Sequence, residues 1–190
     1  MRVLVVDESA ERAELVREAL LRAGLEVTAT LSSPVALLKT IDEVAPDVIV
    51  IDTESPSRDV LEHLVVMSRH TPRPVVMFAS DGAPETIRAA TRAGVSAYVV
   101  DGLDQSRIRT IVDAAVARFD ELQDLRGQLA EANQRLGERK LVERAKGILM
   151  KTRGLDEEGA YRALRRMAMD RNRRIGEVAR SVIEMADLLG

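Results

Sequence analysis

The sequence predicts a five-stranded, doubly wound parallel α/β sheet, then a long coiled-coil helix, then an all-α three-helix unit. Short apolar runs alternate with amphipathic stretches of helical period as far as about residue 100, a pattern typical of buried strands separated by helices. All six prolines lie at or before Pro84, so the second half of the chain has no helix breaker. Beyond Gln105 the apolar residues keep helical spacing. We therefore expect an α/β domain at 1–118, a linker helix at 119–138 and a helical domain at 139–190.

The elements of the first domain follow from its apolar runs and helix signals. The expected strands are Val3–Val6, Val27–Thr30, Val48–Ile51, Val75–Phe78 and Ala97–Val100. The expected helices are Ala10–Ala23, Pro34–Val44, Arg58–His70 and Pro84–Ala93. Ser33 and Pro34 supply an N-cap and a first helical residue, and Gly94 ends the fourth helix. Strands that alternate with helices form a parallel sheet covered on both faces, and such a sheet binds ligands at the carboxyl ends of its strands.

The linker helix carries an apolar seam two heptads long. Its members step by 3, 4, 3 and 4 positions: Leu122, Leu125, Leu129, Ala132 and Leu136. This is the spacing of a coiled coil, so we expect a homodimer that forms through the seam. The alternative is a seam that packs back on its own domain.

The last 50 or so residues indicate a compact three-helix unit. The long helix is expected to end at Gly154, and Asp156 is a suitable N-cap for the next helix. Glu157 and Glu158 in its first turn favour the positive end of the helix dipole. A polar turn at 172–174 leads to the third helix. The residues expected to pack inside this unit include Tyr161, Met150, Met167 and Met169.

Composition and charge exclude several classes of function. There is no cysteine, which excludes a disulfide framework, a zinc ribbon and a thiol nucleophile. No run approaches the roughly 20 apolar residues of a membrane helix, so we expect a cytoplasmic protein without a membrane partner. Residues 1–119 hold 13 basic and 18 acidic side chains, whereas residues 138–174 hold 12 basic and six acidic ones. An acidic front and a basic rear indicate two modules with different partners.

Three carboxylates are expected to meet at one edge of the sheet. Asp7 and Glu8 follow the first strand, and Asp52 follows the third. Adjacent parallel strands bring these ends together, and converging carboxylates can bind Mg²⁺, which prefers oxygen ligands. An aspartate beside such an ion can accept a phosphoryl group, which makes Asp52 the candidate acceptor. No other cofactor is expected.

The front of the chain resembles the receiver domain of bacterial response regulators, which has a flavodoxin-like fold. The resemblance covers about 1–118 and rests on the order of the acidic residues, on Pro56, on the Ala93-Gly94 turn and on Tyr98. The resemblance implies a phosphoryl-accepting aspartate with a bound Mg²⁺ ion.

Two positions depart from the receiver pattern. Receivers end the fourth strand with a Thr or Ser that binds the phosphoryl group, but this chain has Ala79, with Ser80 one residue late and on the other face. Receivers end the fifth strand with a Lys, and this chain has Asp101. Glu54 adds further negative charge near Asp52. We therefore expect a pseudo-receiver that keeps the fold and the acidic corner, with phosphorylation of Asp52 as the alternative.

One face of the long helix carries a narrow basic stripe. At 100° per residue Lys140, Arg144, Gly147 and Lys151 share this stripe. A glycine inside a helix costs about 1 kcal/mol, so we expect a steric purpose for Gly147, namely the approach of a phosphate backbone. The alternative is an ordinary solvated helix face. The predicted nucleic-acid contacts are Lys140, Arg144, Lys146, Gly147, Lys151, Arg165 and Arg166.

The rear of the chain resembles the ANTAR domain, the RNA-binding domain of bacterial antitermination regulators. The similarity covers about 130–188 and rests on a run from Glu143 to Met150, then Glu157–Tyr161, Leu164-Arg165 and Ala168-Met169. With the receiver-like front, the whole chain resembles the NasT-type regulators of nitrate assimilation.

This resemblance implies a function and a set of partners. Such regulators bind paired short hairpins in leader RNA and prevent terminator formation, so they act on the RNA polymerase complex indirectly. A nitrate- or nitrite-sensing inhibitory protein holds the regulator until the ligand releases it, and this control needs no phosphorylation. A dimer with two basic tails suits two adjacent hairpins.

Three other functions were weighed from the sequence. The first is a phosphorylated response regulator that acts on DNA, and the second is an adaptor whose basic face binds an acidic protein. An enzyme is not expected, because the sequence shows no nucleophile–base pair, no Gly-rich phosphate loop and no histidines at ligand spacing. His63 and His70 lie seven residues apart on an expected surface helix.

Overall fold

The computed structural model describes residues 1–100 and 106–189, which form two compact units. The first unit spans Met1–Gln123 and the second spans Asp124–Gly190. The first is α/β and the second is helical, which confirms the predicted fold class. Helix α5 (Ile108–Arg153) runs through the boundary, and the expected linker helix is its middle part.

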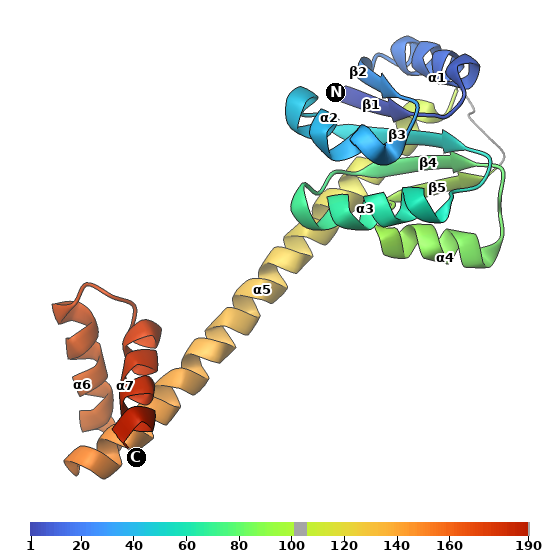
Figure 1. Ribbon diagram of the computed structural model, residues 1–190. Coiled ribbons are helices and arrows are strands. Elements are labelled where there is room, and N and C mark those ends of the chain that lie inside the picture. The colour runs from blue at the N-terminus through green and yellow to red at the C-terminus, as the bar shows by residue number, and fades with distance from the viewer. Residues whose placement is uncertain (101–105, 190) are drawn as a thin grey trace. The chain divides into compact units, whose positions relative to one another are not determined.

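Five parallel strands form one sheet in the order β2-β1-β3-β4-β5 (Figure 1). Their bounds are β1 Arg2–Val6, β2 Glu26–Leu31, β3 Val48–Thr53, β4 Val75–Ala79 and β5 Ala97–Val100. The β3–β4 register sets Asp52 opposite Phe78 and Thr53 opposite Ala79. The predicted acceptor therefore lies at the carboxyl edge of the sheet, where parallel α/β folds place their sites.

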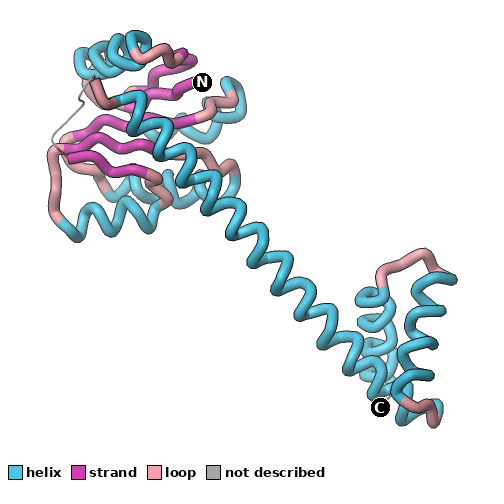
Figure 2. The backbone as a smooth tube through the Cα atoms, turned by 180° about the vertical axis from the view of Figure 1, so that it is seen from behind, coloured by secondary structure: helices cyan, strands magenta, loops and turns pink. Residues whose placement is uncertain are grey.

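Helices cover both faces of this sheet (Figures 1 and 2). They are α1 (Ala10–Arg22), α2 (Leu37–Val44), α3 (Arg58–His70), α4 (Pro84–Ala93) and the first part of α5. One buried cluster joins α1 and α5 to one face and includes Leu20, Phe78 and Ile108. A second cluster joins α2, α3 and α4 to the other face and includes Ile41 and Leu64. Burial on both faces explains why the central strands are apolar throughout.

Side-chain caps determine where several of these helices begin. The Ser9 hydroxyl accepts a hydrogen bond from the backbone N–H of Arg12 and so starts α1. Gly94, with φ of 105°, ends α4 in the left-handed region that favours glycine. One expected helix differs, because the chain first makes a 3₁₀ turn at Pro34–Ala36 before α2 begins at Leu37. Such turns are frequent at helix N-termini.

The second unit is a three-helix arrangement made by the end of α5 with α6 (Glu157–Asp170) and α7 (Ile175–Leu189) (Figure 2). Gly154, with φ of 65°, follows the end of α5, and the Asp156 carboxylate accepts the Gly159 N–H at 2.8 Å to cap α6. Nine buried residues form its core: Val142, Ala145, Leu149, Ala160, Leu164, Ala168, Val178, Ala179 and Ile183.

The predicted seam leucines lie exposed along α5. The exposed fractions are 43% for Leu122, 53% for Leu125, 63% for Leu129 and 54% for Leu136. They form a narrow apolar stripe on a part of the helix that is otherwise mostly polar or charged. Within residues 1–100 and 106–189, no helix has both the length and the apolar character that crossing a bilayer requires.

Candidate nucleic-acid interface and acidic corner

The centre of the basic stripe faces away from the core of the second unit. Lys140, Gly147 and Lys151 lie on the side of α5 opposite Ala145 and Leu149, which are buried. Both lysines are exposed, and neither forms an ion pair with any residue in the described part of the chain. A Cβ atom added to Gly147 would meet nothing within 4 Å. The glycine therefore has no packing role here, and it leaves an open space between two free ammonium groups.

Arg144 lies at the edge of this stripe, next to α7. Its Nη2 atom donates to the two carboxylate oxygens of Asp187 at 3.0 and 3.2 Å. Both side chains are about 60% exposed, and such surface ion pairs contribute little to stability. An approaching phosphate can therefore compete for Arg144 at low cost.

Lys146 lies in a different environment from the one that the sequence suggested. Its side chain is only 9% exposed, and its Nζ atom lies 2.7 Å from Glu157 and 2.9 Å from Glu143. Hydrogen bonds to these two carboxylates raise the pKa of Lys146. RNA contact by Lys146 stays a prediction, but the structure sets this residue apart from the other predicted cations, because its charge is already paired with two carboxylates. The ammonium group fastens the first turn of α6 to α5.

Two arginines of α6 and one of α5 line a pocket that the sequence only partly indicated. Arg165 is exposed and has no ion-pair partner among the described residues, whereas Arg166 lies 3.9 Å from Asp170. The pocket has a volume of 630 Å³ and is lined by Arg153, Arg162, Ala163, Arg166, Met167 and Asp170. Arg153 and Arg162 were absent from the predicted contacts, although both belong to the basic segment whose excess charge the sequence shows.

Three side chains expected inside the second unit lie at its surface instead. Tyr161 is 45% exposed, Met169 is 72% exposed and Met150 is 39% exposed. Met167 packs partly against the core, as expected.

The acidic corner of the first unit contains a cation that the sequence argument missed. Asp7 is 2% exposed, and its Oδ1 atom accepts the Ser9 N–H at 2.8 Å and Nη2 of Arg12 at 2.9 Å. Nη1 of Arg12 also lies 3.8 Å from Glu54. Arg12 could have been found, because a capped helix that starts at residue 10 places residue 12 in its first turn, beside the end of β1.

Asp52 lies half-buried next to this ion pair. Burial and then the charge of Asp7 raise the pKa of Asp52, while Arg12 and the Thr53 N–H act in the opposite direction. Glu8 is exposed, and the described residues contain no group of three His, Cys, Asp or Glu that could hold a metal. The Mg²⁺ ligand set of Asp7, Glu8 and Asp52 stays a prediction, and one of its carboxylates, Asp7, is paired with Arg12 in this structure.

Two family models match the chain. The response regulator receiver domain matches residues 3–113, and the ANTAR domain matches residues 130–183. The transcriptional regulatory protein PdtaR of Mycobacterium tuberculosis (strain ATCC 25618 / H37Rv) is 30% identical over 187 residues, which cover 96% of this chain and 89% of that protein. This chain belongs to the response regulators that carry an ANTAR domain.

Two further similarities each cover a part of this ANTAR response regulator. The nitrate regulatory protein of Klebsiella oxytoca is 52% identical over 68 residues, which are 36% of this chain and 17% of that protein. The chemotaxis protein CheY4 of Vibrio cholerae has a structure that matches 60% of this chain and 97% of its own, with a TM-score of 0.53 and 21% identity. The second similarity supports the receiver fold alone.

One of the two positions at which the sequence differs from the receiver pattern lies within the described residues. Ala79 ends β4 and is 2% exposed, and Ser80 after it is exposed. The Tyr98 hydroxyl donates to the backbone carbonyl of Asp81 at 2.6 Å. Asp101, at the usual lysine position, lies outside the described residues.

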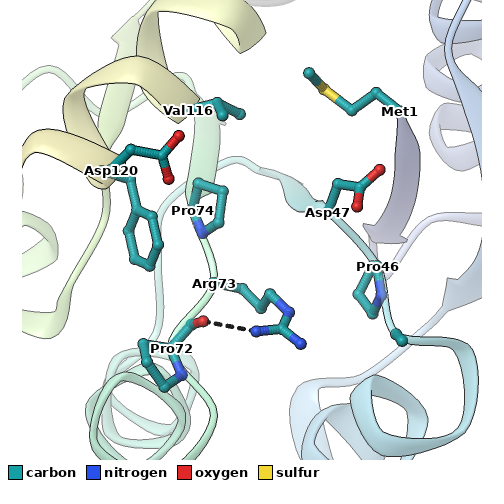
Figure 3. Close-up of a pocket in the computed structure, with 10 residues that line it drawn as sticks. Met1, Pro46, Asp47, Pro72, Arg73, Pro74, Val116 and Asp120 are labelled. Atoms are coloured by element: carbon teal, nitrogen blue, oxygen red, sulfur yellow. Dashed lines mark hydrogen bonds between the residues drawn. The ribbon is translucent and has the colours of Figure 1, made fainter. Parts of the chain in front are cut away.

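A pocket of 460 Å³ lies at the opposite edge of the receiver sheet (Figure 3). Its lining includes Met1, Asp47 and Pro74, which precede β1, β3 and β4 at their amino ends. The guanidinium of Arg73 donates to the neighbouring Pro72 carbonyl at 3.0 Å, as the dashed line shows. Parallel α/β sheets bind ligands at the carboxyl edge, so this pocket is not the counterpart of a receiver site.

Proposed function

We propose that this response regulator is a transcription antiterminator that binds paired hairpins in leader RNA and prevents terminator formation. The observation that carries the proposal is the stripe of Lys140, Gly147 and Lys151 in the ANTAR domain, where two free cations flank an open glycine. Phosphate contacts from lysine supply affinity, and the missing side chain lets the nucleic-acid backbone approach the helix. Arg144, Arg165 and Arg166 extend the contact surface.

Hairpin loops are the expected target. The A-form major groove is too narrow for side chains, so proteins read RNA sequence mainly from unpaired loop bases. Tyr161 is the one aromatic residue of the ANTAR domain, and its exposure of 45% makes it available to stack on such a base. Lys146 supports the surface from within by fixing α6 on α5.

A homodimer would present two ANTAR domains to two adjacent hairpins. The exposed leucines of α5 follow coiled-coil spacing, and a second copy of the same helix is the partner that this spacing suits. Linking two binding modules raises the local concentration of the second, which strengthens binding to a paired target. The two-hairpin arrangement would then be the specific ligand.

Nitrate or nitrite is the proposed signal, and a sensing protein that sequesters the regulator is the proposed means of control. The support is the 52% identity to the nitrate regulatory protein over 68 residues. RNA polymerase would be affected indirectly, through the leader transcript. Control without phosphorylation agrees with Ala79 at the end of β4 and with the ion pair that occupies Asp7.

The deciding experiment is equilibrium binding of the purified protein to a two-hairpin leader RNA. The same RNA with mutated loops, and a DNA duplex of equal length, serve as controls from about 50 to 200 mM salt. Loop-dependent binding that persists at the higher salt supports the proposal. Equal and steeply salt-dependent binding to all three would instead favour a DNA-binding regulator or an adaptor for an acidic protein.

Phosphorylation of Asp52 with DNA-binding or protein-interaction output is the second candidate. The half-buried place of Asp52 at the carboxyl end of β3 favours it. If a small-molecule phosphoryl donor with Mg²⁺ changes the RNA affinity of the protein, and Asp52→Asn abolishes that change, control resides at Asp52 after all.

A further inference from the structure

The acidic corner of the receiver domain already holds a positive charge, the guanidinium group of Arg12. Its Nε lies 3.3 Å from both carboxylate oxygens of Asp7, and its Nη2 lies 2.9 Å from Oδ1. The Asp7 side chain is fully buried, and the Arg12 side chain is 34% exposed. Two-pronged contacts between guanidinium and carboxylate are among the stronger charge-assisted hydrogen bonds. The same guanidinium reaches toward Glu54 in the loop after β3.

The local fold directs Arg12 to this place. Asp7 follows β1, Ser9 caps α1, and Arg12 lies in the first helical turn just above the edge of the sheet. The Ser9 N–H also donates to Asp7, and this hydrogen bond fixes the position of the carboxylate relative to the turn before α1. The hydrogen bond to Asp7 raises the pKa of Arg12, with the charges of Asp52 and Glu54 adding to the effect.

A divalent cation does not fit this arrangement. Asp7 and Asp52 offer the oxygen chemistry that Mg²⁺ prefers, but the Oδ1 atom of Asp7 already accepts three hydrogen bonds, one from the Ser9 N–H and two from the guanidinium of Arg12. A divalent cation bound to Asp7 would lie close to the guanidinium of Arg12, which is 2.9 Å from Oδ1 of Asp7. The two positive charges would repel each other strongly. No three-carboxylate group forms among the described residues.

We infer that Arg12 is a resident cation that takes the place of the divalent ion in this receiver domain and excludes Mg²⁺ and Mn²⁺ from it. The charge of the corner is then constant and independent of the metal supply. The side chain instead ties the start of α1 to the loop after β3, through Asp7 on one side and Glu54 on the other. This goes beyond the RNA-binding proposal and does not depend on it.

The test is a titration of the full-length protein with Mn²⁺, followed by the electron paramagnetic resonance signal of the free ion. Wild type is compared with Arg12→Ala and with Arg17→Ala, which removes an exposed arginine–glutamate pair on the same helix. We expect Arg12→Ala to bind one Mn²⁺ at least about tenfold more tightly than wild type, with Mg²⁺ as a competitor. Arg17→Ala is expected to behave as wild type.

Three results would overturn the inference. They are wild type binding Mn²⁺ as tightly as Arg12→Ala, Arg12→Ala showing no gain, and the gain persisting in the Arg12→Ala/Asp52→Asn double variant. If Arg12→Ala does not fold, Arg12→Gln keeps the length of the side chain without its charge, and the same expectations apply to it. Far-UV circular dichroism establishes folding before each titration.

Discussion

The acidic corner of the receiver domain and the basic stripe of the ANTAR domain differ in where their counter-charges come from. In the corner, the fully buried side chain of Asp7 is paired with Arg12 at 2.9 Å. On the stripe, Lys140 and Lys151 have no ion-pair partner in the described residues, and the space at Gly147 between them is open. The corner carries the more familiar motif, yet its fully buried carboxylate, that of Asp7, already has a counter-charge within the chain.

This difference indicates which region has to meet a partner. A buried carboxylate needs an internal counter-charge, because leaving it unpaired lowers the stability of the fold by several kcal/mol. Exposed lysines cost almost nothing in water, so they can stay unpaired until a polyanion arrives and releases its counterions. We therefore expect the acidic corner to stabilise the receiver fold and the basic stripe to bind the partner.

The largest expected effect is the loss of RNA affinity when the proposed dimer is broken, because each protein then presents one basic stripe to the RNA and not two. Leu129→Asp places a charge in the middle of the α5 seam, where the wild-type side chain is 63% exposed. We expect the proposed dimer to dissociate and the affinity for a two-hairpin RNA to fall about 100-fold, with the affinity for a single hairpin unchanged. Sedimentation and RNA titration measure the two quantities.

Val35→Asp is the matched control for this charge. Val35 is 77% exposed on the receiver domain, so it receives the same added aspartate away from α5. A monomeric Leu129→Asp variant that keeps full affinity for two hairpins would show that one stripe suffices.

Removing the free cations is expected to have the next largest effect. The Lys140→Ala/Lys151→Ala double variant should lower RNA affinity about 10- to 100-fold and reduce the slope of log K against log salt by about 1.5, because two phosphate contacts are lost. Arg88→Ala, an exposed arginine of the receiver domain, is the control. Wild-type RNA affinity in the double variant would show that the unpaired lysines of the stripe do not bind RNA.

Gly147→Ala should change stability and binding in opposite directions. Alanine in place of a glycine inside a helix stabilises by roughly 0.5–1 kcal/mol, and nothing lies within 4 Å of the added methyl group. If the glycine exists to admit a phosphate backbone, RNA affinity should fall about fivefold, an effect of about 1 kcal/mol. Chemical denaturation and RNA titration measure the pair.

Gly127→Ala provides the internal comparison for that variant. Gly127 lies on the same helix, outside the matched ANTAR residues, and its added Cβ would also meet nothing within 4 Å. It should gain the same stability without losing affinity. A loss of RNA affinity in both variants would mean that a change in the helix as a whole lowers the affinity, and that close approach of the phosphate backbone at residue 147 is not the cause.

The fold was predictable from the sequence because its signals are local. Proline at the helix starts, apolar runs of strand length and the cap at Asp156 locate the elements within a few residues. The free face of α5 was predictable for the same reason, since 100° per residue places Lys140 and Lys151 together.

The misplaced side chains depend on contacts between elements, which spacing does not reveal. Lys146 lies at the border of the apolar face, and only the position of Glu157 on α6 shows that its charge is already used. The side chain of Arg12 reaches back to Asp7 across the turn between β1 and α1. The sequence shows the acidic pair Asp7-Glu8 but not this contact, and the pair alone suggests a metal site. In both cases the missing information was the nearest opposite charge.

The smallest expected effect tests whether Arg12 fully compensates the corner. Burial and the neighbouring Asp7 raise the pKa of Asp52, so the folded protein binds that proton more tightly than the unfolded chain does. The ionised carboxylate then weakens the fold at neutral pH, and Asp52→Asn should raise the Tm at pH 7. The gain should shrink as the pH falls through the raised pKa of Asp52 in the folded protein, and it should be absent below the ordinary aspartate pKa of 3.8, where both states are protonated. Thermal unfolding across that range, with Glu8→Gln as an exposed control, measures it. A lower Tm at pH 7 would mean that Arg12 supplies more positive charge than Asp7 uses, and that Asp52 belongs to the ion pair.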